Sequence, residues 1–269
     1  MIAFTDQELD ELPLLEGALA LNSAIDPTTS VHWVRDELER MAQDAEALLG
    51  HETDIELRFQ GLVRLFYQDW GFQGDFEQYF SSDNTFLDKV LERRKGIPIS
   101  LGTLFLFVAE RLALPVKAVG FPTQLILRVD WPHRYREYMN PFNGEMVSKH
   151  VLHGWLKGKE GPLAELLPEH LALTDNATLI GRWLAVIKSA LLREENYPLA
   201  LRCSEMALTF SPDDPYEIRD RGYIYQQLNC DLVAADDYEF FINQCPDDPA
   251  TELLKIQIKV LNEAHPVLH

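Results

Sequence analysis

The strongest constraint on the fold is a short sequence that occurs twice near the C-terminus. Residues 211–215 read Ser-Pro-Asp-Asp-Pro and residues 245–249 read Cys-Pro-Asp-Asp-Pro, so the copies are 34 residues apart. This near-identity and spacing indicate an internal repeat built from a pair of helices. One such pair cannot bury its apolar face alone, so consecutive pairs stack against one another. The C-terminal part of the chain is therefore predicted to be all-α.

The period and the matched residues are typical of tetratricopeptide repeats. Ala200 matches Ala234, and a small side chain there lets two helices approach closely, while Gly222 and Tyr225 fall in a first helix and Tyr238 in a second. A proline after each second helix stops it. A helical bundle with a chance repeat is the structural alternative. We expect two repeats and a capping helix, with helices over 177–193, 197–210, 215–227, 231–244 and 249–264.

The first part of the chain predicts helices followed by strands. Apolar residues follow a helical period from Ser30 to Leu49, and a buried apolar helix begins near Ser100. Asn143-Gly144 is expected to end the sheet that follows. The predicted strands are 116–121, 124–130 and 136–140, and a further helix is predicted over 147–156.

A central helix that leads into an antiparallel sheet is an α+β arrangement. The polar stretch around Leu171 to Ala177 marks the domain boundary. The sequence therefore predicts two domains, an α+β domain over 1–175 and an all-α repeat domain over 176–269.

Four segments carry a resemblance to a known family over essentially the whole chain. They are Gly96-Ile-Pro-Ile-Ser-Leu101, Gly120-Phe-Pro-Thr-Gln-Leu-Ile-Leu-Arg128, Asn140-Pro-Phe-Asn-Gly144 and Asp214-Pro-Tyr-Glu-Ile-Arg-Asp-Arg-Gly222. With these motifs the chain resembles the SirB family of transglutaminase-like proteins with a tetratricopeptide tail. The resemblance implies a papain-like, transglutaminase-like N-terminal domain, and it implies no established activity.

In an active relative, the nucleophile lies at the start of a buried helix, and a His and an Asp lie on the following strands. Carried over by position, the catalytic Cys would fall at or within two residues of Ser100. The His would fall at Gln124 and the Asp at Asn140. None of the three catalytic residue types is retained.

The replacements remove the chemistry that such a triad needs. A thiolate is activated by an imidazole, which a carboxylate holds in its useful tautomer. A Gln amide cannot take up and release a proton near neutral pH, and an Asn carries no charge. The three cysteines are Cys203, Cys230 and Cys245, so residues 1–202 contain no thiol. We therefore expect a degenerate site with no catalytic residue.

Each of these positions also has an ordinary structural interpretation. Ser100 would be the N-cap of its helix, Asn140 would shape the Asn-Pro turn, and Gln124 would hydrogen-bond across the former cleft. The enzyme alternative is a hydrolase or transferase that uses Ser100 with a rearranged histidine. The candidate histidines are His133, His150 and His153.

His150 and His153 are also spaced as two ligands on one helix face could be. They lack the adjacent carboxylate of patterns such as His-Glu-x-x-His. We therefore predict no metal site and no cofactor.

The charge of the chain limits its partners. Lys and Arg number 24 against 43 Asp and Glu, a net charge of −19, which opposes broad contact with nucleic acid or with an anionic membrane. The acidic N-terminus without an apolar run is not typical of a signal peptide, so a cytoplasmic protein is expected. Residues 176–269 carry 15 acidic and 8 basic residues, a net charge of −7.

These features favour a non-catalytic protein-binding or regulatory protein with a tetratricopeptide interaction surface. Because the repeats are acidic, the expected partner is a protein or peptide segment that is basic or amphipathic. The acidic residues predicted to contact it are Asp213, Asp214, Asp236 and Asp237.

Overall fold

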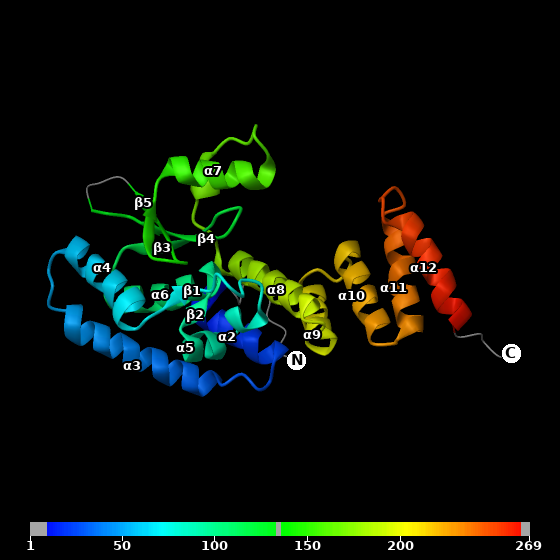
Figure 1. Cartoon of the computed structure of the whole chain (residues 1–269), viewed down its shortest axis with the longest axis horizontal. Coiled ribbons are helices and arrows are strands. Elements are labelled where there is room, and N and C mark those ends of the chain that lie inside the picture. Colours follow the sequence, from blue (N-terminus) through cyan, green and yellow to red (C-terminus); the bar gives the residue numbers. More distant parts are fainter. Residues whose placement is uncertain (1–9, 133–135, 265–269) are drawn as a thin grey trace. The chain divides into compact units, whose positions relative to one another are not determined.

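The computed structural model describes residues 10–132 and 136–264 (Figure 1). Within these ranges the chain divides into two compact units, the first ending at Trp183 and the second beginning at Leu184. The division falls inside helix α8 (Asn176–Arg193), so each unit contains part of it. A domain boundary at 175/176 stays a prediction.

Helices make up most of the first unit before the sheet. The predicted apolar face after Ser30 is confirmed, because Val34, Leu38 and Met41 are buried along one helix. The helix near Ser100 is buried as predicted, but it begins two residues earlier, at Pro98. The helices of this part are α2 (Leu14–Ile25), α3 (Val31–Leu49), α4 (Ile55–Arg64), α5 (Leu87–Arg93) and α6 (Pro98–Arg111).

Short elements connect α4, α5 and α6. Two two-residue strands, β1 (Gln73–Gly74) and β2 (Lys95–Gly96), pair in parallel. Beside them Arg93 forms an ion pair with the buried carboxylate of Asp75, with Nη2 and Oδ2 2.6 Å apart. This pair fixes the segment between α4 and α5. The short helical turns are the π-helical η1 (Leu65–Asp69) and the 3-10 turns η2 (Ser82–Asn84) and η3 (Pro168–Leu171).

The main sheet is antiparallel with its strands in chain order. The predicted strands are present, but Asn143-Gly144 does not end the sheet, because it forms the turn into a fourth strand. Gly144 has a φ of 75°, which favours glycine, and Asn-Gly between two strands is a hairpin signal. The strands are β3 (Val116–Gly120), β4 (Leu125–Val129), β5 (Glu137–Asn140) and β6 (Glu145–Val147).

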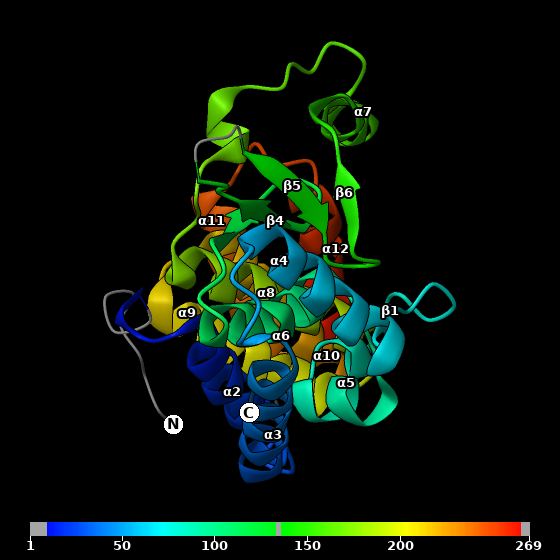
Figure 2. The ribbon, with the colours of Figure 1, turned by 90° about the vertical axis from the view of Figure 1, so that its left-hand side faces the viewer.

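Helices cover both faces of this sheet. Figures 1 and 2 show α6 and α7 (Lys149–Glu160) on opposite sides of it. On the α6 side, an ideal Cβ on Gly102 would lie 2.5 Å from a methyl carbon of Leu125, so helix and sheet are in close contact. On the α7 side, Leu152 and Leu156 pack in one cluster with Ile126 of β4.

The second unit is a series of antiparallel helices (Figure 1). The two prolines expected after second helices, Pro212 and Pro246, each lie two residues beyond a helix end. The tetratricopeptide helices are confirmed to within two residues at every end. Among helices in the described ranges, none has the length and apolar composition that a membrane span needs. The helices after α8 are α9 (Tyr197–Phe210), α10 (Pro215–Gln227), α11 (Asp231–Gln244) and α12 (Thr251–Ala264).

Small residues set the close packing of α10 on α11. Ala234 is fully buried. An ideal Cβ on Gly222 would lie 3.0 Å from the Tyr238 ring and 3.0 Å from Cβ of Asp237. A larger residue at either position would force these two helices apart.

Candidate functional site

Two of the three positions carried over from the triad are in direct contact. Gln124 immediately precedes β4 and Asn140 ends β5, its antiparallel neighbour. The Gln124 Nε2 donates a hydrogen bond of 3.0 Å to Oδ1 of Asn140. A neutral amide pair therefore lies at the two positions predicted to correspond to the imidazole and the carboxylate.

Asn140 also shapes the turn that follows it. Its Oδ1 accepts a second hydrogen bond from the Phe142 N–H at 3.1 Å, and its backbone carbonyl accepts from the Gly144 N–H at 2.9 Å. The Tyr67 hydroxyl donates to the Pro141 carbonyl at 2.8 Å, and burial raises the pKa of Tyr67 well above its usual value. Tyr67 is therefore a neutral donor that supports the turn.

Ser100 is the third residue of α6 and not its N-cap, which corrects the expected role. Ile97 is the N-cap, because Pro98 is favoured as the first helical residue and starts the helix earlier. The Ser100 hydroxyl accepts from the Ile97 N–H at 3.2 Å and lies 2.7 Å from the Asn84 carbonyl oxygen, to which it donates. Ser100 is completely buried. Its hydroxyl therefore bonds backbone groups on the side of Asn84.

Among the described residues, Ser100 makes no hydrogen bond to Gln124 or Asn140. Two positions along a helix differ by about 200° around its axis, so Ser100 and Gly102 point in nearly opposite directions. Gly102 is the residue whose ideal Cβ would contact Leu125 and Pro141, the neighbours of the amide pair. Gly102 is within the two-residue range predicted for the nucleophile, but a glycine has no side chain that could contact the amide pair.

The surface beside Gln124 carries a shallow hollow of about 440 Å³. Thr123, Trp155, Gly158 and Lys159 complete its lining. Lys159 Nζ donates to the Pro122 carbonyl oxygen at 2.6 Å. None of the described lining groups is a carboxylate or an imidazole.

The structure describes two of the candidate histidines, His150 and His153, and neither is a hydrogen-bond partner of Ser100. His150 is exposed on α7, and Nε2 of His153 is 2.9 Å from the Ala164 carbonyl oxygen. His133 lies outside the described residues. In the ranges that the structure describes, three or more His, Cys, Asp or Glu side chains do not gather in a group able to hold a metal ion.

Three of the four acidic residues predicted to contact a partner are exposed: Asp213, Asp214 and Asp236. Asp237 is only 6% exposed, which corrects that expectation. Its two carboxylate oxygens accept from Nη2 and Nε of Arg221 at 2.6 and 2.8 Å. Asp237 lies between Ala234 and Tyr238 on the side of α11 that packs on α10, so it is a structural residue.

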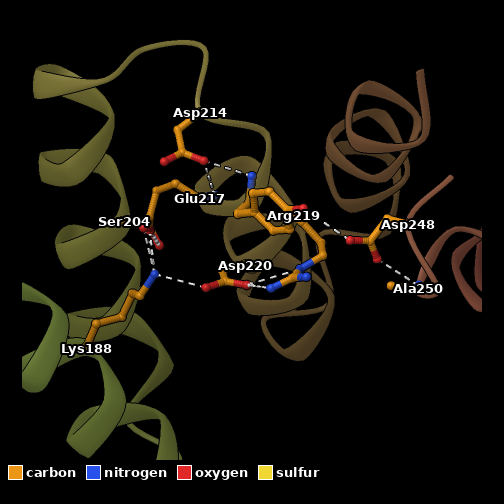
Figure 3. Close-up of polar contacts among 9 residues, drawn as sticks. Lys188, Ser204, Asp214, Glu217, Arg219, Asp220, Asp248 and Ala250 are labelled. Carbon is orange, nitrogen blue, oxygen red and sulfur yellow. Dashed lines mark hydrogen bonds and ion pairs between the residues drawn. The ribbon is translucent and has the colours of Figure 1, made fainter. Parts of the chain in front are cut away.

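Asp214 is exposed and also has a structural role. Its side chain caps α10, accepting from the Tyr216 N–H at 2.9 Å and from the Glu217 N–H at 3.3 Å (Figure 3). The first Asp-Asp-Pro therefore encodes a helix start. Asp213 and Asp236 remain as the exposed acids without such a role.

Sequence reasoning missed a polar network that links α8, α9 and α10 (Figure 3). Lys188 Nζ lies 2.7 Å from Oε1 of Glu217 and 3.1 Å from Oδ2 of Asp220. Ser204 donates to Glu217 at 2.6 Å. Burial alone would lower the pKa of Lys188, but these carboxylates raise it above its usual value. These residues are far apart in sequence. The repeat register predicts which helices pack against each other, and that is the one signal that could have indicated the network.

Comparisons with known proteins agree with this architecture. Residues 32–185 match the model of the transglutaminase-like superfamily, and residues 187–259 match a tetratricopeptide repeat model. A UPF0162 protein of Vibrio cholerae is 56% identical over 262 residues, which are 97% of each chain. UPF0162 protein YchA of Escherichia coli K12 is 44% identical and protein SirB1 of Salmonella typhimurium 42% identical, each over the full length of both chains. No solved structure matches.

The two family models together cover the N-terminal α+β unit and the helical repeats, and the relatives match along nearly the whole chain. The chain therefore belongs to the SirB1/UPF0162 family, whose members join a transglutaminase-like domain to tetratricopeptide repeats.

Proposed function

We propose that this chain is a non-catalytic protein that binds a basic or amphipathic protein segment through its tetratricopeptide helices. The observation that carries the non-catalytic part is the state of Ser100. Its hydroxyl is fully buried and bonds the backbone of Ile97 and Asn84. A nucleophile must reach its substrate and have a base within hydrogen-bond distance, and this hydroxyl has neither among the described residues.

The binding part of the proposal rests on the surface of the second unit. Tetratricopeptide repeats generally mediate contacts between proteins. Here Tyr223 on α10 and Ile256 on α12 are 44% and 59% exposed, and the acids Asp213 and Asp236 are also exposed. Exposed apolar side chains together with uncompensated acids favour a ligand that offers both apolar and basic residues.

Capture of partners by the full-length chain tests this proposal. The test variant is Asp213→Lys with Asp236→Lys, which leaves the Asp214 cap and the Asp237 ion pair intact. The control, Glu77→Lys with Glu92→Lys, makes the same change of charge at exposed positions of the first unit. Raising salt from about 50 to 500 mM shortens the screening length from roughly 14 to 4 Å, so it should weaken capture as the test variant does.

The outcomes separate the two surfaces of the chain. Loss of capture with the test variant and with salt, but not with the control, would support the repeats as the binding surface. Capture that ignores both but disappears on altering Gln124 or Asn140 would contradict the proposal and place binding at the amide pair. A glutamine- or peptide-directed activity that Ser100→Ala abolishes would contradict the non-catalytic part.

A further inference from the structure

A cavity of about 1000 Å³ lies on the α7 side of the sheet, at the end away from the amide pair. Arg128 in β4 and Tyr138 in β5, which are paired residues of the two strands, form its floor. Lys149 at the start of α7 and Arg136 before β5 line its sides, and residues 166–168 and 171–173 form an apolar wall. The cavity shares no lining residue with the hollow beside Gln124.

Arg128 is the unusual residue of this cavity. It is only 6% exposed, and its Nη2 donates to Oδ2 of Asp130 at 2.8 Å. Within the described residues its Nε is buried and has no hydrogen-bond partner, and neither has Oδ1 of Asp130. A buried donor without an acceptor is unfavourable, and more so when it is charged. The guanidinium is thus held at the floor of the cavity with hydrogen-bonding capacity unused.

The charges around Arg128 favour an anion. Asp130 serves two guanidinium groups, because Nε of Arg136 is 3.3 Å from its Oδ1. Lys149 adds a third cation, and the described lining residues include no carboxylate. Three cations against the single charge of Asp130 leave this site positive in a chain whose net charge is −19. An anion entering this cavity would balance the excess positive charge and would accept hydrogen bonds from Arg128.

The opposite wall selects a ligand with an apolar part. Leu167 and Leu173 are 41% and 51% exposed, and Leu166 and Leu171 pack against the cluster under α7. The volume is at the upper end of that typical of small-molecule sites, about 300–1000 Å³. A carboxylate is the planar group that matches a guanidinium. We propose that this cavity binds a small carboxylate with an apolar body, its head at Arg128, Arg136 and Lys149.

Calorimetric titration of the full chain with octanoate tests the assignment. Octanol lacks the charge, acetate lacks the apolar part, and octyl phosphate replaces the carboxylate head. Octanoate should bind, while octanol and acetate should bind at least about tenfold more weakly. No binding of octanoate up to about 5 mM, or equal binding of octanol, would overturn the proposal. Tighter binding of octyl phosphate than of octanoate would overturn the choice of a carboxylate.

Variants then locate the binding site. Arg136→Gln and Lys149→Gln change exposed residues, whereas Arg128→Met would leave Asp130 partly unpaired and could unfold the chain. Each exposed variant should weaken octanoate binding about fivefold, since one partly screened charge contact is lost. The control is Lys157→Gln, the same change on an exposed part of α7 outside the cavity, and it should leave binding unchanged. Octanoate binding that is equal in all three variants and the parent chain would refute the site.

Discussion

Replacing Ser100 by alanine is the change that best separates a structural serine from a catalytic one. The hydroxyl lies 2.7 Å from the Asn84 carbonyl oxygen and 3.2 Å from the Ile97 nitrogen, and all three groups are buried. Ser100→Ala leaves this carbonyl and this N–H without their partner. The nearby Ile97 carbonyl keeps a hydrogen-bond partner in this variant, because it accepts from the Leu101 N–H at 3.0 Å.

The expected cost follows from the number of groups left unpaired. Each buried donor or acceptor without a partner costs about 1–3 kcal/mol, so two predict a loss of about 2–6 kcal/mol in the free energy of unfolding. Loss of an ordinary N-cap side chain would cost about 1 kcal/mol. The larger value is expected because Ser100 bonds across to η2 as well as to its own helix.

Tryptophan fluorescence during urea unfolding can measure this cost in the unit that contains Ser100. The five tryptophans are Trp33, Trp70, Trp131, Trp155 and Trp183. All of them belong to the first unit, and four lie outside α8, the helix that both units share, so the signal reports chiefly that unit. A loss of about 2–6 kcal/mol should lower the midpoint by about 1 M urea or more.

A matched control is Thr103→Val on the same helix. Thr103 is 1% exposed, and its hydroxyl bonds only the Ile99 carbonyl one turn earlier, at 2.9 Å. Valine keeps the shape and leaves no long-range partner unsatisfied, so the expected cost is below about 1 kcal/mol. If Ser100→Ala costs no more than this control, the argument from unpaired backbone groups is wrong.

Three further predictions use other parts of the chain. Ala234→Leu should overpack the contact of α11 with α10 and lower the free energy of unfolding by about 1–3 kcal/mol, while the control Val233→Leu, at a 44% exposed site, should cost little. Thermal unfolding followed by circular dichroism measures both, and equal tolerance of the two variants would contradict the predicted close contact. Burial raises the pKa of the Cys203 thiol to about 12, so a thiol reagent near pH 8 should label exposed Cys230 quickly and Cys203 only on unfolding; equal rates would argue against the helix packing. Burial would raise the pKa of Asp75, but the Gln78 N–H and Arg93 lower it below its usual value. The stability it contributes is therefore present above its unfolded pKa of about 4 and lost as pH falls through the lower folded pKa, and Asp75→Asn should reduce this acid sensitivity in urea titrations.

The sequence by itself determined the helical repeats almost completely. The first Pro-Asp-Asp-Pro marks a helix start, because Asp214 caps α10 and Pro215 is its first residue, and α12 begins at Thr251, two residues after the second copy. Small residues at Ala200, Gly222 and Ala234 mark close helix contacts. Caps, prolines and small residues act within a few positions of themselves, so local sequence is enough to place the helices.

The strands were also predictable, while the turn after β5 was misread. Asn143-Gly144 was expected to end the sheet, although the same dipeptide is a signal for a hairpin. The strand β6 that follows is only three residues long, and its first two residues, Glu145 and Met146, are exposed. A strand that is this short and this exposed does not show the alternation of apolar and polar residues by which strands are recognised from sequence.

Only the tertiary structure decided what the side chains of the candidate sites bind. Asp236 and Asp237 are adjacent, yet one is exposed and the other is buried against Arg221, because successive helix positions differ by about 100° in direction. Ser100 takes its partner from Asn84, sixteen residues earlier. Arg128 lies at the floor of a cavity whose opposite wall comes from residues 166–168 and 171–173. Such partners are brought together by packing between distant segments, and this distance is why the local patterns of the sequence do not contain them.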